Sequence, residues 1–277
     1  MSTVGRRSAG QPNPSQSKER YLRGKLVVVI TAIAMLVFAT AAYAAVNSYT
    51  GSGLTFSKGV GTKANPVGVS RIETLAAKNV DPTKTAAPLT HVTFKIYGLV
   101  SNAKQFPTCS ATKIVQQKSD KFCPTKSKFA SGSTNALLGN STLSPATRTP
   151  CHPGLDVFNG GGNKLVYFFF TDAQHQCGGL TTGVTPPYFG TVKQAGKNQI
   201  IDIPLPPSIS TRVANQPGFY SSLIHQQLTW YKLSTKVKGK TVYNSASVGC
   251  QKGKRPWSIT ITALGDKART VSGSSPC

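Results

Sequence analysis

The clearest two-residue period in the chain runs through Trp257-Ser-Ile-Thr-Ile-Thr-Ala263, where apolar residues alternate with hydroxyl-bearing residues. Successive side chains of a β-strand point to opposite faces, so this period predicts a strand with one buried face. Residues 91–100 show the same period, with Val92, Phe94 and Ile96 at alternate positions. Both stretches favour an antiparallel sheet.

Turn residues divide the neighbouring sequence into further strands. Residues 164–170, Lys-Leu-Val-Tyr-Phe-Phe-Phe, follow a glycine-rich turn at 159–163 and predict a strand buried on both faces, with a membrane-inserting loop as the alternative. Two hairpins are also predicted. The first pairs 188–194 with 199–205 through 195–198, with Ile201, Ile203 and Leu205 pointing inward; the second pairs 228–237 with 241–248 across Lys238-Gly239-Lys240.

The composition agrees with a β-rich fold. The 26 glycines and 18 prolines interrupt the chain too often for long helices, and after residue 46 no segment of helical length has apolar residues at three- and four-residue spacing. We therefore expect an all-β protein, an antiparallel β-sandwich with a jelly-roll-like arrangement stapled by up to three disulfides. Residues 89–277 form the main part of one domain, and residues 45–88 supply N-terminal edge strands and a linker around Asp81-Pro82-Thr83.

The N-terminal region has the layout of an export signal. Residues 1–25 form a basic leader that we expect to be disordered, and residues 26–44 are apolar and uncharged. The small-x-small pattern Ala42-Tyr43-Ala44 predicts cleavage before Ala45 by the Sec-type route. A retained membrane anchor is the open alternative, and it is the only membrane contact we expect. Either case predicts a protein that is secreted or associated with the cell wall.

Cysteine usage agrees with an oxidising compartment. All six cysteines follow the apolar segment, which predicts a disulfide framework, although their number allows 15 pairings. We expect the sequential set, which pairs Cys109 with Cys123, Cys151 with Cys177 and Cys250 with Cys277. A zinc site is not expected, because no Cys-x-x-Cys pair is present.

Basic residues greatly outnumber acids, with 32 lysines and arginines against 8 acids and a net charge of +24. Six basic residues and one acid precede the apolar segment, so the remainder keeps 26 basic and seven acidic residues. Such a surface attracts anions, and we expect an anionic cell-wall polymer or a glycan as partner. The alternative is that scattered lysines only keep the protein soluble and guard its sheet edges. Export makes nucleic acid an unexpected physiological partner.

The second hairpin is the candidate binding surface, because it combines lysines with aromatic residues that could stack on sugar rings. Its candidate residues are Trp230, Tyr231, Lys236, Lys238, Lys240 and Tyr243. Alternate residues of a strand share a face, so we expect the lysines to project together.

No catalytic residue, metal site or cofactor is predicted. His152 and His175 flank Cys151 and Cys177 and, together with Asp156 and Asp172, form the one group able to bind a metal, but its spacing matches no metal motif. Two hypotheses remain. The first is a secreted or cell-envelope-associated non-enzymatic protein that binds an anionic or glycan surface or serves structurally. The second is a carbohydrate-active hydrolase or lyase on a jelly-roll scaffold, with an acid and a base among Asp156, Asp172, Asp202 and His175.

The cysteine neighbourhoods resemble those of a known group. Phe106-Pro-Thr-Cys109-Ser, Cys123-Pro, Ser131-Gly-Ser, Cys151 and the terminal Ser-Ser-Pro-Cys277 resemble exported, β-rich, disulfide-containing proteins of actinobacteria. The likeness covers residues 49–277. It implies an exported β-rich protein, and it carries over no functional residue because no activity is assigned to that group.

Overall fold

The computed structural model describes residues 47–140, 144–178 and 183–277. The chain divides into one unit at Met1–Ala44 and another at Ala45–Cys277. The predicted leader, the apolar segment 26–44 and the cleavage point before Ala45 therefore lie outside the described residues. The fold described below is that of the second unit.

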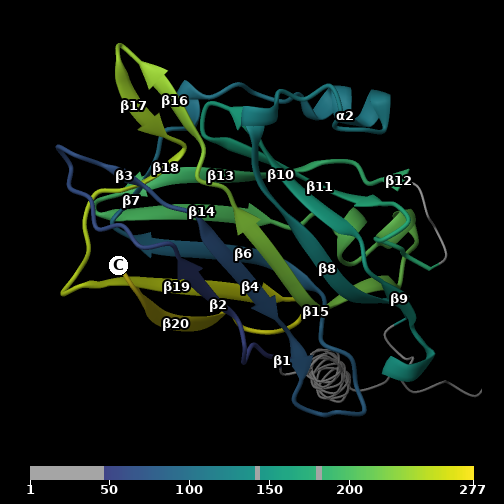
Figure 1. Cartoon of the computed structure of the whole chain (residues 1–277). Helices are drawn as coiled ribbons and strands as arrows, with labels where there is room; N and C mark the ends of the chain where they lie inside the picture. Colours follow the sequence, from purple (N-terminus) through teal and green to yellow (C-terminus); the bar gives the residue numbers. More distant parts are fainter. Residues whose placement is uncertain (1–46, 141–143, 179–182) are drawn as a thin grey trace, which may run out of the picture. The chain divides into compact units, whose positions relative to one another are not determined.

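Thirteen strands of the described residues form one sheet, and every strand pair in it is antiparallel (Figure 1). In spatial order, the main path is β2 (Gly53–Phe56), β4 (Arg71–Ala76), β15 (Phe219–Trp230), β8 (Lys128–Asn140), β10 (Gly154–Gly161), β11 (Lys164–Thr171), β13 (Tyr188–Ala195), β14 (Asn198–Pro204), β6 (Leu89–Tyr97), β19 (Lys254–Ala263) and β20 (Arg269–Pro276). Two short strands, β9 (Thr149–Cys151) and β12 (Gly183–Val184), pair beside this path.

Three small sheets accompany the main one. They pair β1 (Asn47–Ser48) with β5 (Lys78–Asn79), β16 (Ser234–Val237) with β17 (Lys240–Tyr243), and β18 (Ser245–Ser247) with both β3 (Val67–Gly68) and β7 (Leu99–Ser101). The β16–β17 hairpin stands away from the main sheet, near the top of Figure 1.

The main sheet curls until its first and last strands meet. The Ser275 hydroxyl of β20 donates a hydrogen bond to the Leu54 carbonyl of β2 at 2.7 Å. Gly53 and Gly273 flank the Trp257 ring on these neighbouring strands, and a side chain at Gly273 would collide with that ring. The all-β antiparallel class is confirmed, but a jelly-roll is not, because the strands form one continuous curled sheet.

The inner face of the curled sheet encloses the core. Phe94, Ile96, Leu155, Ile201 and Ile259 are all at most 1% exposed and come from four different strands. The predicted alternation in 257–263 is confirmed, since Ile259, Ile261 and Ala263 are buried. The same holds for the first hairpin, whose β13 and β14 pair through a turn at 196–197.

The outer face of β10 and β11 carries a second apolar cluster. Phe158, Val166 and Phe168 pack there against Ile114 of the helix α2 (Ala111–Gln117). The Ser110 side chain caps this helix by accepting a hydrogen bond from the Lys113 amide. Apolar contacts therefore cover β11 on both sides, which confirms that residues 164–170 form a doubly buried strand.

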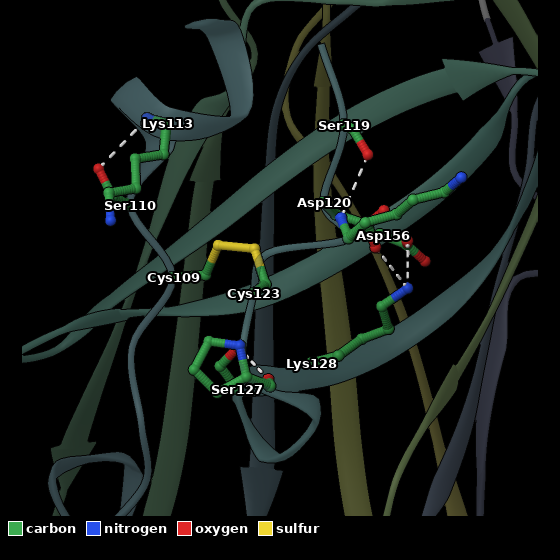
Figure 2. Close-up of a disulfide and its surroundings, with 11 residues drawn as sticks. Cys109, Ser110, Lys113, Ser119, Asp120, Cys123, Ser127, Lys128 and Asp156 are labelled. Carbon is green, nitrogen blue, oxygen red and sulfur yellow. Dashed lines mark hydrogen bonds and ion pairs between the residues drawn. A yellow bond between two sulfur atoms is a disulfide. The ribbon is translucent and has the colours of Figure 1, made fainter. Parts of the chain in front are cut away.

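The predicted disulfide pairing is confirmed, and no cysteine is free. The bonds join Cys109 to Cys123, Cys151 to Cys177 and Cys250 to Cys277. Figure 2 shows the first bond beside the α2 cap, where it holds residues 109–123 over the outer cluster.

Several expected boundaries are wrong. The strand expected at 91–100 breaks at Gly98, whose positive φ of 68° and close approach to the Gly249 carbonyl require glycine. Strand β4 is interior rather than an edge, because β2 and β15 flank it. In the expected linker around Asp81-Pro82-Thr83, the Asp81 carboxylate accepts the Thr83 amide hydrogen within a turn. One more strand, β20, follows the strand predicted at 257–263, and no strand was predicted there.

Candidate ligand-binding cavity

The interior of the curled sheet is packed toward one end and hollow toward the other. The hollow is a cavity of about 630 Å³. Apolar side chains from opposite sides of the sheet form most of its wall. They include Leu75, Val92, Ala136, Phe169, Ile203 and Leu223.

Glu73 is the acidic residue of the cavity wall, and β4 directs it inward. Arg71, Glu73 and Leu75 occupy the buried face of β4, whereas Ile72 is 40% exposed on the opposite face. The Trp230 indole N–H donates a hydrogen bond to Glu73 Oε2 at 3.0 Å. The Arg71 guanidinium lies 3.7 Å from the centroid of the Trp230 ring and 3.9 Å from the same carboxylate oxygen.

Burial dominates the electrostatics of this pair. It raises the pKa of Glu73 to about 7, although Arg71 and the Trp230 hydrogen bond oppose the rise. Burial also lowers the pKa of Arg71 to about 10, against the opposing effect of Glu73. Arg71 therefore stays charged at neutral pH and supplies the counter-charge when Glu73 ionises.

Two tyrosines from neighbouring strands lie close to Glu73. The rings of Tyr167 and Tyr188 stack with centroids 5.2 Å apart. Gly190 leaves room for them, because a Cβ there would press on the Tyr167 ring. Burial raises the pKa of both phenols above the usual 10, with Glu73 adding to the rise, so both remain neutral hydrogen-bond donors.

Four polar atoms of this group have no hydrogen-bond partner among the described residues. They are Glu73 Oε1, the Tyr167 hydroxyl and two nitrogens of the Arg71 guanidinium, and all four are inaccessible to solvent. Buried polar atoms in proteins are ordinarily hydrogen-bonded, and an orphaned one costs about 1–3 kcal/mol. A buried polar group with unsatisfied hydrogen-bonding capacity therefore lies beside the largely apolar wall of the cavity.

The segment between β14 and β15 forms part of the wall of the cavity, which is partly open to solvent. These two strands lie on opposite sides of the curled sheet, so residues 205–218 must cross between them. Ile209, Ala214 and Asn215 line the cavity, while Ala214 and Asn215 are also solvent-exposed. Ala214 and Asn215 both have positive φ, of 54° and 60°. For alanine this conformation is strained, and such strain is often found at ligand-binding sites.

The disulfide between Cys151 and Cys177 contributes another part of the wall, together with Gly178 and Thr149. It ties β9 to the chain that follows β11. The wall on this side is thus held by a covalent bond, in contrast to the crossing segment.

The surface residues predicted on the second hairpin do not form one binding face. Trp230 is only 6% exposed and belongs to the Glu73 group, so it is not a surface stacking platform. Lys236 lies opposite Thr241, and Val237 lies opposite Lys240. Directly opposite residues share a face, which places Lys236 and Lys240 on opposite faces of the hairpin. Lys238 occupies the turn with a φ of 48°.

The remaining two surface aromatics flank the base of the hairpin. Tyr231 is 36% exposed, and Tyr243 is half-buried with the Lys232 ammonium 5.5 Å from its ring centroid. Only these two of the three predicted aromatics are accessible to a surface ligand.

The acids and the histidine of the hydrolase hypothesis each have structural partners. Asp156 accepts hydrogen bonds from Lys128 at 2.7 Å and Ser131 at 2.6 Å, as Figure 2 shows for the lysine. Burial raises its pKa, although these two partners oppose the rise. Lys128 also reaches Asp120 at 2.8 Å, so it bridges two acids beside the first disulfide.

The other residues of the hydrolase hypothesis, Asp172, Asp202 and His175, have partners of their own and do not contact Asp156. Asp172 accepts hydrogen bonds from the Gln174 and His175 amides and contacts the His175 ring at 2.9 Å. Asp202 accepts from Thr93 at 2.8 Å and lies 2.8 Å from His91 Nε2. His152 contacts Asn135 instead. Within the described ranges, no three His, Cys, Asp or Glu side chains converge as metal ligands.

The sequence prediction missed Glu73, Tyr167 and Tyr188 as site residues. One signal was available: Glu73 is the sole glutamate after the apolar N-terminal segment, and it lies in the alternating run Arg71-Ile-Glu-Thr-Leu75. In that run Arg71, Glu73 and Leu75 share one face and Ile72 and Thr74 the other, so the alternation alone does not indicate which face is buried. A charged residue facing inward is visible only once the strand partners are known.

Comparison with protein-family models, with curated proteins and with solved structures found no match for this chain. The resemblance to exported actinobacterial proteins stays an expectation. Among the described residues, no helix has the length and apolar character that a membrane crossing requires.

Proposed function

We propose that this chain is an exported, non-enzymatic binding protein that holds a small, largely apolar molecule in the cavity inside its curled sheet. One observation carries the proposal: an apolar cavity of about 630 Å³, partly open to solvent, extends into the curled sheet beside a core packed to near-zero exposure. Protein interiors normally contain few voids larger than a water molecule. Small-molecule sites typically occupy roughly 300 to 1,000 Å³ and have apolar walls with a few polar groups.

Binding is favoured over turnover by the chemistry of the wall. Among the described lining residues the ionisable groups are Glu73, Tyr167 and Tyr188, and the two lining cysteines are joined in a disulfide. Acid–base or nucleophilic catalysis needs a second group poised near neutral pH or a base beside a nucleophile. Glu73 alone has a pKa near neutrality, and its neighbours are a tryptophan and an arginine.

The three disulfides are compatible with an extracellular location. Export by a Sec-type signal at 26–44, and retention near the cell wall, belong to the same proposal. An exported protein with a deep apolar cavity of this kind would shield the apolar part of a poorly soluble compound from water.

The test uses diphenylhexatriene, a hydrocarbon dye that fluoresces when it leaves water. We expect saturable binding to the native protein. In the variant Ala136→Phe a phenyl ring enters the cavity, and we expect the dye affinity to fall by about tenfold or more. Filling a void in this way costs little stability compared with overpacking a full core.

Ala195→Phe is the matched control. Ala195 is exposed at the end of β13, so the same added ring lies outside the cavity. Dye binding should then equal that of the native protein. The proposal is wrong if the native protein does not enhance the dye, or if folded Ala136→Phe binds it as well as Ala195→Phe does.

A second candidate function is salt-dependent binding to an anionic polymer of the cell wall. It is favoured by one observation: each of the seven acidic side chains in the described part already contacts an arginine, lysine or histidine. The hairpin lysines Lys236, Lys238 and Lys240 are exposed and form no ion pair within that part. Their charge is therefore available to an external anion.

A further inference from the structure

We infer that the disulfide between Cys250 and Cys277 is a thiol-exchange site, at which a small external thiol forms a reversible mixed disulfide with the protein. The inference does not depend on the cavity. It follows from the position of Arg255, a buried cation that lies beside both sulfur atoms and forms no ion pair.

Arg255 is fully buried, and its guanidinium contacts polar atoms but no acid. Its Nη2 donates to the Ser247 hydroxyl at 2.7 Å and to the Gly59 carbonyl at 3.3 Å. The same nitrogen lies 3.8 Å from Cys250 Sγ and 3.8 Å from Cys277 Sγ. Nε and Nη1 have no hydrogen-bond partner among the described residues.

The charge of Arg255 is therefore uncompensated. None of the ion pairs among the described residues includes it. Burial lowers the pKa of Arg255 to about 10, so the side chain still carries its charge at neutral pH. A buried charge without a partner is costly, and a thiolate at either neighbouring sulfur would supply the missing negative charge.

A thiolate beside Arg255 makes this bond easier to open. A neighbouring arginine lowers the pKa of a cysteine thiol, and a disulfide whose reduced form is stabilised is more readily reduced. Within the described ranges, no basic side chain donates to a sulfur of either other disulfide. We therefore expect the bond between Cys250 and Cys277 to be the most reducible of the three.

Exposure also distinguishes this bond from the other two. Cys250 and Cys277 are both partly exposed. Each of the other two bonds includes a buried cysteine, Cys109 at 3% and Cys151 at 6% exposure. A thiol arriving from solvent therefore reaches the Cys250 end of the molecule more easily than the other disulfides.

The exchange balances without a further oxidant or reductant. The external thiolate attacks one sulfur and forms a new S–S bond with it. The original S–S bond breaks, and its electron pair stays on the other sulfur, which leaves as a thiolate beside Arg255. When this thiolate attacks the mixed disulfide, the original bond forms again and the external thiol is released. Lys252 and Lys254 are exposed next to Cys250 and attract an incoming anionic thiol.

The end of the chain keeps other attachments when the bond opens. The Cys277 amide donates to the Gly253 carbonyl at 3.0 Å, and its main-chain oxygen accepts from the Gly59 amide at 2.9 Å. Strand β20 also stays paired with β19. The two sulfurs therefore remain near each other and near Arg255, which makes the exchange reversible.

The first test equilibrates the native protein with mixtures of reduced and oxidised glutathione at pH 8. Alkylation followed by peptide mass spectrometry then reports which bonds are open. We expect the bond between Cys250 and Cys277 to open at a lower ratio of reduced to oxidised glutathione than the other two, with glutathione attached to one of its cysteines. In this partly reduced protein, the pH dependence of the alkylation rate should give a thiol pKa at least about one unit below the usual value of about 8.5.

The inference is overturned if another disulfide opens at a lower glutathione ratio, or if both thiols titrate at about 8.5 or above. Both measurements use the native protein, so they decide the question even if a variant of the buried arginine does not fold.

Arg255→Met and Arg255→Lys form a matched pair, because both remove the guanidinium but only lysine keeps the positive charge. In Arg255→Met, we expect the equilibrium constant for reduction of this bond at pH 8 to fall by about tenfold, which corresponds to one unit in the thiol pKa. Arg255→Lys should stay close to the native value. Equal constants in the two folded variants would show that the charge does not promote opening of the bond.

Discussion

The buried carboxyl group of Glu73 should make the free energy of unfolding depend on pH. Its ordinary pKa is 4.5, and burial raises the folded-state pKa to about 7. Between these values the folded protein retains a proton that the unfolded chain has released. Raising the pH through this range therefore favours unfolding. Across this range the free energy of unfolding should fall by about 3 kcal/mol. Above about pH 7 this group should cause no further fall.

Urea unfolding at a series of pH values measures this effect, with Glu73→Gln as the diagnostic variant. Glutamine keeps an oxygen for the Trp230 indole and does not titrate, so the decline between about pH 4.5 and 7 should flatten. The exposed Asp172 serves as control, and Asp172→Asn should keep the native decline. If the free energy of unfolding falls with pH equally in the native protein and in Glu73→Gln, this carboxyl group does not cause the pH dependence.

At the residue scale the sequence could predict which side chains alternate, but not always which set is buried. Val92, Phe94 and Ile96 were assigned correctly because only one of their two faces is apolar. In β4 the alternation is ambiguous, and the strand buries Arg71 and Glu73 while exposing Ile72. Trp230 was expected at the surface, but it is buried and donates its indole N–H to Glu73. A buried polar group is recognised only with its partner, and this partner is 157 residues away.

The crossing segment between β14 and β15 contains backbone strain that a single substitution should relieve. Ala214 has φ 54° and ψ 28°, in the left-handed region. Alanine in this region costs roughly 1–2 kcal/mol more than in its usual conformations, and glycine has no such penalty. We expect Ala214→Gly to raise the free energy of unfolding by about 0.5–1 kcal/mol, part of the gain being offset by the flexibility of glycine in the unfolded chain.

Ala195→Gly is the comparison, because Ala195 is also exposed but lies at the end of β13 without positive φ. It should lower stability by a few tenths of a kcal/mol up to about 1 kcal/mol. Chemical denaturation of both variants gives the sign directly. A destabilised Ala214→Gly would mean that the alanine methyl group contributes more to the cavity wall than the strain costs.

At the element scale, strands with a clean two-residue period and short turns were predictable, as in β13, β14 and β19. Longer strands of the central sheet were missed. Strand β15 contains a register shift between Leu223 and His225: Ser221 and Leu223 line the cavity before the shift and Gln226 lines it after the shift. Ser222 is buried on the other face, where it accepts a hydrogen bond from Arg148. A shift of one residue reverses the faces, so the sequence period of β15 is broken although its pairing with β8 continues. Strand β20 was missed because its residues are mostly small and polar.

At the scale of the whole molecule, the sequential disulfides were predictable because each bond closes a loop of local sequence. The separations are 14, 26 and 27 residues. Closure of the sheet was not predictable. It depends on contacts such as the one between Ser275 and Leu54, which are 221 residues apart. The cavity follows from that closure, so no local pattern could have indicated it.

Positive side chains far outnumber negative ones, and this excess is a property of the whole molecule. The 26 basic and seven acidic residues after the apolar segment leave an excess of about +19. Because the acids already contact basic residues or histidines, most lysines face solvent without a negative neighbour. Fields between exposed charges extend about 8 Å at physiological ionic strength, so binding driven by this excess must weaken as salt is added.

We expect purified anionic cell wall to retain the protein at low salt and to release it at high salt. The triple variant Lys236→Gln, Lys238→Gln and Lys240→Gln should be retained less, even though the three side chains do not share one face, because the projecting hairpin concentrates their charge. The fold should be unaffected, since exposed substitutions usually change stability by less than about 0.5 kcal/mol. A control that replaces the exposed Lys63, Lys78 and Lys193 by glutamine removes the same net charge from scattered positions. Equal losses in both triple variants would indicate a general charge effect, whereas retention of both at the native level, insensitive to salt, would mean that the lysines only keep the protein soluble.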